Sequence, residues 1–113
     1  MNIKFLEKKL LNSSKMQFLI IVPAKGSSQR IPNKNMVLLN GKPLLYYTLN
    51  VCKKFKDQIY TLISTDSSKI RKYCESQGFR DIHKRPKSLS THKTTMTQVI
   101  INVVNWLKKN ALL

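Results

Sequence analysis

The sequence predicts an α/β protein of three layers, in which a mostly parallel sheet lies between helices. Short apolar runs alternate along the chain with segments whose apolar residues recur at helical spacing. The first apolar run, residues 17–22, is continuous, as expected for a strand covered on both faces. Strands separated by single helices favour right-handed crossover units, and such units place helices on the faces of a parallel sheet.

The first helix is expected over residues 44–55, after a short apolar segment at residues 37–39 and an Asn40-Gly41 turn. Pro43 stands where a proline favours the start of a helix. Apolar residues then recur at helical spacing, at Leu45, Leu49, Cys52 and Phe55.

The second strand is expected over residues 59–64, and the second helix over residues 68–77. Asp66 or Ser67 can cap that helix, and Gly78 can end it.

A short third strand is expected over residues 80–83 and a last helix over residues 94–108. Lys108 and Lys109 suit the negative end of this helix. Its predicted core face comprises Val99, Ile100, Val103, Val104 and Leu107, and Trp106 is expected to pack.

A basic loop, residues 23–35, follows the first strand. Lys25, Arg30 and Lys34 supply three positive charges within ten residues, and Gly26 lets the backbone approach a ligand closely. The loop is neither a Walker A sequence nor a Gly-x-Gly-x-x-Gly turn. From composition alone, a polyphosphate site and a plain basic surface loop are equally good interpretations of this segment. Ligands of parallel sheets bind at the carboxyl ends of the strands, where this loop and Ser-Thr-Asp at residues 64–66 should form one crevice.

The order of these residues resembles that of the acylneuraminate cytidylyltransferases, or CMP-sialic acid synthetases. The resemblance begins with Pro-Ala-Lys-Gly-Ser-Ser-Gln-Arg-Ile-Pro-x-Lys-Asn at residues 23–35 and Leu-Asn-Gly-Lys-Pro-Leu at residues 39–44. Three further stretches follow in the family's order: Ile-Ser-Thr-Asp at 63–66, Arg85-Pro86 with Leu-Ser-Thr at 89–91, and Thr94-Thr95. The resemblance covers residues 17–108 and implies a Rossmann-like nucleotidyltransferase fold.

That family transfers CMP from CTP to the anomeric hydroxyl of a nine-carbon sugar acid, such as N-acetylneuraminate, and releases pyrophosphate with Mg²⁺ as cofactor. The resemblance implies that Lys25 and Lys34 are catalytic charges on the triphosphate, and that Arg85 and Thr94 lie by the cytosine and ribose. The full set of nucleotide-binding residues that it implies is Pro23, Ala24, Lys25, Ser28, Arg30, Lys34, Asn35, Arg85 and Thr94. It implies no metal ligand in this chain, because the paired magnesium aspartates of the family fall beyond residue 113.

The sequence departs from the family pattern at four positions. Lys25 replaces an Arg, which keeps the charge but loses bidentate geometry. Ser27 replaces a common Gly, Gln29 a common Lys and His92 a common Asp. Together these departures indicate relaxed constraint or a divergent branch.

At 113 residues the chain is one domain at most. We interpret residues 16–113 as the N-terminal part of a cytidylyltransferase domain, truncated after the third helix, and residues 1–15 as an extension outside the fold. A gene fragment, a truncated frame and one piece of a split enzyme stay open. The 113-residue chain alone is expected to be inactive. A homodimer is expected for a full-length relative.

The chain has 21 Lys and Arg against 5 Asp and Glu, so its formal net charge is 21 − 5 = +16. Clustered cations favour phosphate-rich partners, but most of these charges are spread out and no nucleic-acid-binding motif accompanies them. We therefore expect CTP and a sugar acid as partners, and no nucleic acid. A small basic nucleic-acid-binding protein is the alternative from another class. Legionaminate, pseudaminate and 3-deoxy-manno-octulosonate are the alternative sugar acids.

No stretch reaches the ~20 apolar residues of a membrane span. Cys52 and Cys74 are expected to be reduced packing residues, and His83 and His92 lack partners at zinc-ligand spacing. A cytoplasmic location, and a role in lipopolysaccharide or other surface-glycan synthesis, follow from the resemblance.

Overall fold

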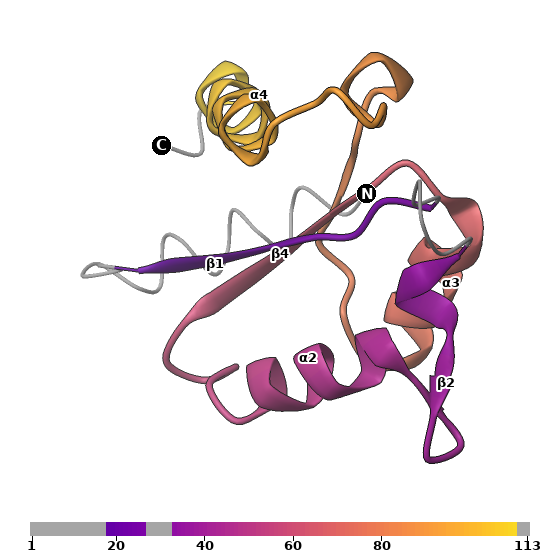
Figure 1. Cartoon of the computed structure of the whole chain (residues 1–113). Helices are drawn as coiled ribbons and strands as arrows, with labels where there is room; N and C mark the ends of the chain where they lie inside the picture. The colour runs from indigo at the N-terminus through magenta and orange to yellow at the C-terminus, as the bar shows by residue number, and fades with distance from the viewer. Residues whose placement is uncertain (1–17, 27–32, 111–113) are drawn as a thin grey trace.

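The computed structural model describes residues 18–26 and 33–110, and a parallel sheet forms its centre. The strands of this sheet are, in spatial order, β1 (Leu19–Pro23), β4 (Tyr60–Thr65) and β5 (Ile82–Lys84). The helices are α2 (Leu44–Lys53), α3 (Ser68–Ser76) and α4 (Met96–Lys109). Helices α2 and α3 lie on one face of the sheet and α4 on the other (Figure 1), so the predicted three-layer α/β fold is confirmed.

The strand register aligns the carboxyl ends of the three strands. Pro23 of β1 pairs with Ser64 of β4, and Thr65 of β4 pairs with Lys84 of β5. The segments that follow these strands therefore leave the sheet at the same edge, where ligands of such sheets bind.

Two apolar clusters fill the spaces between the layers. The cluster beneath α2 and α3 contains Val22, Ala24, Leu45, Leu49, Cys52, Ile63, Ile70, Cys74, Phe79 and Ile82. The cluster beneath α4 is smaller and contains Tyr60, Leu62, Val103 and Leu107, with Leu19, Ile21 and Trp106 packed against it. Because β1 contributes to both clusters, its continuous apolar run does indicate a strand covered on both faces.

A small hairpin connects β1 to α2. Strands β2 (Leu38–Leu39) and β3 (Lys42–Pro43) pair antiparallel across Asn40 and Gly41, whose φ angles are 52° and 76°. Positive φ at both turn residues is the conformation that Asn-Gly favours, so the predicted turn is confirmed. Short 3₁₀ helices, η1 (Lys34–Met36) and η2 (Lys87–Leu89), lie in the loops that follow β1 and β5.

Several predicted boundaries shift by one or two residues. β1 begins at Leu19, since Phe18 lies outside the strand and Gln17 lies outside the described residues. α2 ends at Lys53 rather than Phe55, because the amides of Lys54 and Phe55 donate to carbonyls three residues back, at Val51 and Cys52. This tighter hydrogen bonding is characteristic of a helix that is ending.

The turn after α3 displaces the third strand from its predicted position. Gly78 has φ 92°, and the amide of Phe79 donates to the carbonyl of Cys74, which caps α3. β5 then begins at Ile82, where pairing with Ile63 becomes possible, instead of at residue 80. The expectation that Gly78 ends the helix is confirmed.

Helix α4 begins at Met96, two residues later than predicted, with Thr95 as its N-cap. Thr95 and Gln98 form a capping box, in which Thr95 Oγ1 accepts from the Gln98 amide at 3.2 Å and Gln98 Oε1 accepts from the Thr95 amide at 2.8 Å. The helix buries Val99, Val103 and Leu107, whereas Ile100 is 42% exposed. The prediction that Ile100 belongs to the core face was therefore wrong.

Cys52 and Cys74 are free, buried thiols in the larger apolar cluster, as predicted. Burial raises the pKa of Cys74 to about 12, so this thiol stays protonated at neutral pH. Among the residues with described structure, no helix is long and apolar enough to cross a membrane.

The capping box gives a stability prediction. Thr95→Ala should lower the free energy of unfolding by about 1 kcal/mol, because the amide of Gln98 loses its acceptor. Urea unfolding followed by circular dichroism would measure the change. Thr97→Ala, at an exposed position of the same helix, is the matched control and should not destabilise. Equal stability of the two variants would contradict the assigned cap.

Candidate functional site

Three chain segments meet at the carboxyl edge of the sheet. The amide of Ala24, just after β1, donates to the carbonyl of Ser64 at 2.8 Å. The amide of Arg85, just after β5, donates to the carbonyl of Thr65 at 2.8 Å. These two hydrogen bonds continue the parallel ladders past the ends of β1 and β5, so the three segments are fixed relative to one another.

Asp66 links the first segment to the second. Its Oδ1 accepts a hydrogen bond from the amide of Gly26 at 2.8 Å, and its carboxylate attracts the guanidinium of Arg85. A half-buried carboxylate thus holds the start of the basic loop beside a cation. The sequence pattern placed Asp66 at this edge but did not reveal that it holds Gly26. An acidic residue directly after a strand, opposite a glycine loop, is the signal that points to such a contact.

The packing of the protein itself also requires a glycine at position 26. A Cβ at this position would lie 2.9 Å from Ser67 Cβ and 3.5 Å from Asp66 Oδ1, so protein atoms already occupy the space beside the glycine. Ser67 is the N-cap of α3, and its Oγ accepts from the amide of Ile70 at 3.2 Å. The loop therefore packs against the N-terminus of α3, where the helix dipole favours anions.

Arg85 is held rigidly although it is a long side chain. It is only 7% exposed, and its Nε donates to the carbonyl of Leu89 at 2.7 Å. Burial lowers the pKa of Arg85, and attraction to Asp66 opposes that shift. An arginine remains charged even so, and Arg85 is a fixed positive charge at this edge.

The predicted residues of the basic loop are tied together where they are described. Asn35 Nδ2 donates to the carbonyl of Lys25 at 2.9 Å, which joins η1 to the segment after β1. Lys25 is half-buried and Lys34 is exposed on η1. Ser28 and Arg30 lie outside the described residues, as does the predicted N-terminal extension, residues 1–15.

The structure brings several of the predicted residues together. Pro23, Ala24 and Lys25 share one edge with Arg85 through the hydrogen bonds above. Thr94 belongs to the segment before α4, and within the described ranges its hydrogen bonds go to Thr91: amide to carbonyl at 3.1 Å and hydroxyl to hydroxyl at 3.0 Å.

A buried polar cluster lies directly behind this edge. Ser64 Oγ is 2.9 Å from His83 Nδ1, and the ring of Trp106 meets the imidazole edge-on, with centroids 5.4 Å apart. Burial lowers the pKa of His83, the side chain of Asn102 opposes this as a hydrogen-bond partner, and the charge of Arg85 adds to it. His83 is therefore neutral at pH 7. The expectation that Trp106 packs is confirmed.

The described residues do not by themselves fit a magnesium ion. Over residues 18–26 and 33–110, no group of three His, Cys, Asp or Glu side chains could hold a metal. The carboxylate of Asp66 already accepts from Gly26 and attracts Arg85. One carboxylate so engaged is a poor substitute for the oxygen-rich site that this cation requires.

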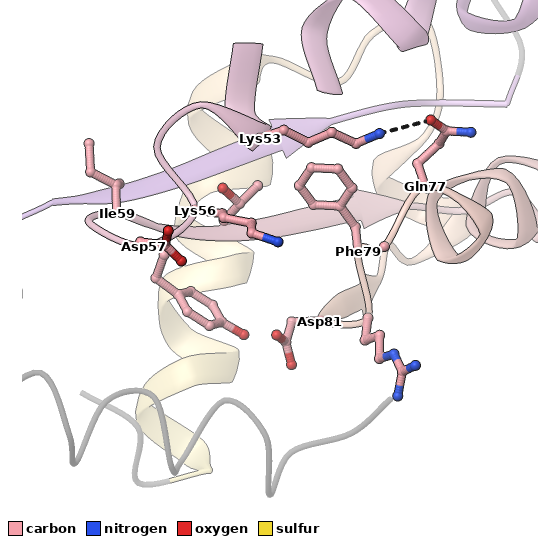
Figure 2. Close-up of a pocket in the computed structure, with 11 residues that line it drawn as sticks. Lys53, Lys56, Asp57, Ile59, Gln77, Phe79 and Asp81 are labelled. Atoms are coloured by element: carbon pink, nitrogen blue, oxygen red, sulfur yellow. Dashed lines mark hydrogen bonds between the residues drawn. The ribbon is translucent and has the colours of Figure 1, made fainter. Parts of the chain in front are cut away.

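A cavity of about 440 Å³ lies at the opposite edge of the sheet (Figure 2). Residues from the end of α2 and from the α3–β5 connection line it, and Lys53 Nζ donates to Gln77 Oε1 across it at 3.1 Å. Burial and the neighbouring carboxylate of Asp81 raise the pKa of Tyr60 above its usual range. Of the residues predicted to bind a nucleotide, none that the structure describes lines this cavity.

The close packing of Gly26 yields a second prediction. Gly26→Ala should lower the free energy of unfolding by about 1 to 3 kcal/mol, because the new methyl group collides with Ser67 Cβ. Adding Ser67→Gly removes that Cβ and should restore most of the loss, since glycine is a tolerated N-cap. Chemical denaturation of the two single variants and the double variant measures the coupling. Additive losses would contradict the proposed contact.

The burial of His83 predicts how stability depends on pH. The folded pKa lies below the ordinary value of 6.5, so folding is favoured above pH 6.5 and that contribution is lost as pH falls further. The stability of the wild type relative to His83→Val should therefore fall by up to about 1.4 kcal/mol per pH unit below about pH 6.5. Urea titrations at several pH values measure the difference. A constant difference down to about pH 5 would contradict a depressed pKa.

Comparison with known proteins places these observations in a family. Residues 19–110 match the family model described as cytidylyltransferase. The N-acylneuraminate cytidylyltransferase of Streptococcus agalactiae serotype V is 33% identical over 82 residues, which cover 71% of this chain and 20% of that protein. The pseudaminic acid cytidylyltransferase of Campylobacter jejuni serotype O:2 is 31% identical over 93 residues, covering 82% of this chain and 40% of that protein.

A third relative has another sugar acid in its name. The CMP-N,N'-diacetyllegionaminic acid synthase of Legionella pneumophila is 29% identical over 89 residues, which cover 79% of this chain and 38% of that protein. The chain thus spans only between a fifth and two fifths of these three relatives. The parallel sheet with helices on both faces is consistent with a Rossmann-like nucleotidyltransferase fold. Since the family model matches residues 19–110, which are most of the chain, this protein belongs to the cytidylyltransferase family.

Proposed function

We propose that the crevice at the carboxyl edge of the sheet binds CTP, and that this chain supplies the nucleotide-binding portion of an enzyme that transfers CMP to a sugar acid. One observation carries the proposal. The amide of Gly26 is fixed by Asp66, and the carboxylate of Asp66 attracts the buried cation Arg85, where the basic loop leaves β1. A glycine loop fixed beside a helix N-terminus and a rigid cation suits a nucleoside triphosphate.

Each predicted residue has a distinct task in this proposal. Lys25 and Lys34 neutralise the triphosphate, and Asn35 keeps their two segments together through the carbonyl of Lys25. Arg85 and Thr94 contact the cytosine and ribose. Ser28 and Arg30 add a hydroxyl and a charge to the phosphate contacts.

The proposed reaction joins the anomeric oxygen of the sugar acid to the α-phosphate of CTP while the bond to pyrophosphate breaks. Charge on the departing pyrophosphate is what the enzyme must stabilise, and positioned cations do this most effectively. Lys25 and Lys34 would hold that charge in this chain. Magnesium would supply further neutralisation when bound, with its protein ligands outside the described residues.

N-acylneuraminate is the substrate that we favour, and related nine-carbon acids are the alternatives. The names of relatives with similar identities specify N-acylneuraminate, pseudaminic acid and legionaminic acid. 3-Deoxy-manno-octulosonate is a more distant alternative. We further propose that the complete enzyme is a cytoplasmic homodimer that serves lipopolysaccharide or other surface-glycan synthesis.

A nucleic-acid-binding role is supported only by the net charge of +16. Binding to duplex DNA that falls steeply with salt and that CTP does not compete away would favour this alternative. A CTP affinity that does not change when DNA is added would favour the nucleotide site.

The proposal predicts that the purified chain binds CTP with Mg²⁺, and that Lys25→Gln and Lys34→Gln each raise its Kd roughly three- to tenfold, because each removes one charge contact with phosphate. Isothermal titration calorimetry measures the Kd. Lys54→Gln is the matched control, since Lys54 is an exposed cation beyond the far end of α2, and it should leave the Kd unchanged.

Equal effects of all three substitutions would show that only net charge matters and would contradict the site. The same protein should release no pyrophosphate from CTP with N-acetylneuraminate, because most of the sugar-acid pocket and the metal ligands are expected outside it. Clear turnover would overturn the proposal that this chain supplies only the nucleotide-binding portion of the enzyme.

A further inference from the structure

One imidazole lies where three elements of the fold meet. His83 belongs to β5, its Nδ1 is 2.9 Å from Ser64 Oγ of β4, and its ring packs edge-on against Trp106 of α4. The Asn102 side chain, one turn earlier on α4, is a further hydrogen-bond partner of the imidazole. Among the polar contacts described above, this cluster alone links β4, β5 and α4.

This Ser-His pair is not a nucleophile and its base. Ser64 is fully buried and His83 is only 3% exposed, so no substrate reaches either side chain. The cluster must act through the elements that it joins.

Each of the three elements continues directly into the nucleotide edge. The carbonyl of Ser64 accepts from the amide of Ala24, and Asp66, two residues further on, accepts from Gly26. Arg85 follows His83 by two residues, directly after β5. Helix α4 begins at its cap Thr95, about 10 Å of helix before Asn102, and Thr94 precedes that cap.

We propose that His83 is a positioning residue, which fixes Ser64 against α4 and so sets the place of the Ala24–Gly26 segment and of Thr94 together. The functional part of this inference rests on the proposed CTP site. It assigns a role to His83, Asn102 and Trp106, which the sequence motifs leave without one.

Histidine suits this task because its two ring nitrogens can serve two partners with opposite roles. Asn102 favours the charged imidazole, as an amide oxygen that accepts from a ring N–H would. In the tautomer with its proton on Nε2, Nδ1 can accept from the Ser64 hydroxyl. A valine or leucine in the same place would fill the volume but would leave the hydroxyl of buried Ser64 without its partner.

Amide hydrogen exchange of the full chain tests the positioning without any nucleotide. In His83→Val, the amides of Ala24 and Gly26 should exchange about tenfold faster than the change in global stability explains, because Ser64 loses its anchor. His83→Asn places a polar group near the position of Nδ1 and should restore part of the protection.

Val103→Ala is the matched control, because Val103 is a fully buried residue of α4 that belongs to the apolar cluster and has no polar side chain to bond His83 or Ser64. It should weaken the packing of α4 and speed the exchange of all globally protected amides alike. If His83→Val and Val103→Ala gave the same exchange pattern at matched stability, the positioning role would be overturned.

The CTP affinity of the same variants separates this inference from the proposed function. His83→Val should raise the Kd for CTP at a temperature where both variants are fully folded, and Val103→Ala should not. An unchanged Kd in His83→Val overturns the functional part of the inference. If the wild type bound no CTP, the proposed site and that functional part would fail, and the exchange pattern would decide the structural part alone.

Discussion

The alignment of β1 with β4 is the constraint on which the rest of the site depends. Pro23 pairs with Ser64, and the next amide, Ala24, donates to the Ser64 carbonyl. A slip of one residue would exchange the two faces of β1, because the side chains of a strand alternate. Val22 and Ala24 would then leave the core beneath α2 and α3, and Gly26 would no longer meet Asp66. Core packing therefore determines where the basic loop begins.

Asp66 matters more in this chain than one carboxylate ordinarily would. With a formal net charge of +16, the segment after β1 and the end of β5 bring cations to one edge, where they repel one another. Asp66 accepts a hydrogen bond from Gly26 of the first segment and attracts Arg85 of the second. Because it is half-buried, its charge is screened less than a surface charge would be. A bound polyphosphate would likewise neutralise the positive charge of the remaining lysines at this edge.

The sequence predicted the layers well because the spacing of apolar residues reflects which side chains are buried. Leu45, Leu49 and Cys52 repeat at helical spacing and do pack beneath the sheet. The boundaries were less predictable, because local hydrogen bonds decide them: the capping box at Thr95 and the turn around Gly78 each moved an element. Ile100 shows the limit of periodicity, since an apolar residue on the margin of a helical stripe can face solvent.

The site was predictable only in part, for a related reason. Motif order led to the basic loop and to Arg85, which are close in space because parallel strands end together. Contacts between residues distant in sequence cannot be recognised from the order and spacing of residue types. Gly26 meets Ser67 across forty-one residues (67 − 26), and the Ser64 hydroxyl meets His83 nineteen residues away. Such contacts depend on the register of the sheet, which no local spacing encodes.

The cavity of about 440 Å³ (Figure 2) lies at the edge of the sheet opposite to the proposed site, and physical chemistry explains why a nucleotide site and a cavity need not coincide. A deep cavity is what an apolar ligand requires, since its affinity comes from surface removed from water. A triphosphate gains little from such burial and much from fixed amides, a helix N-terminus and nearby cations, which an open loop can present. The edge after β1 has those features, whereas the cavity brings Lys53 against Gln77 and Tyr60 against Asp81. The volume of the cavity alone therefore does not make it the better site for a nucleotide.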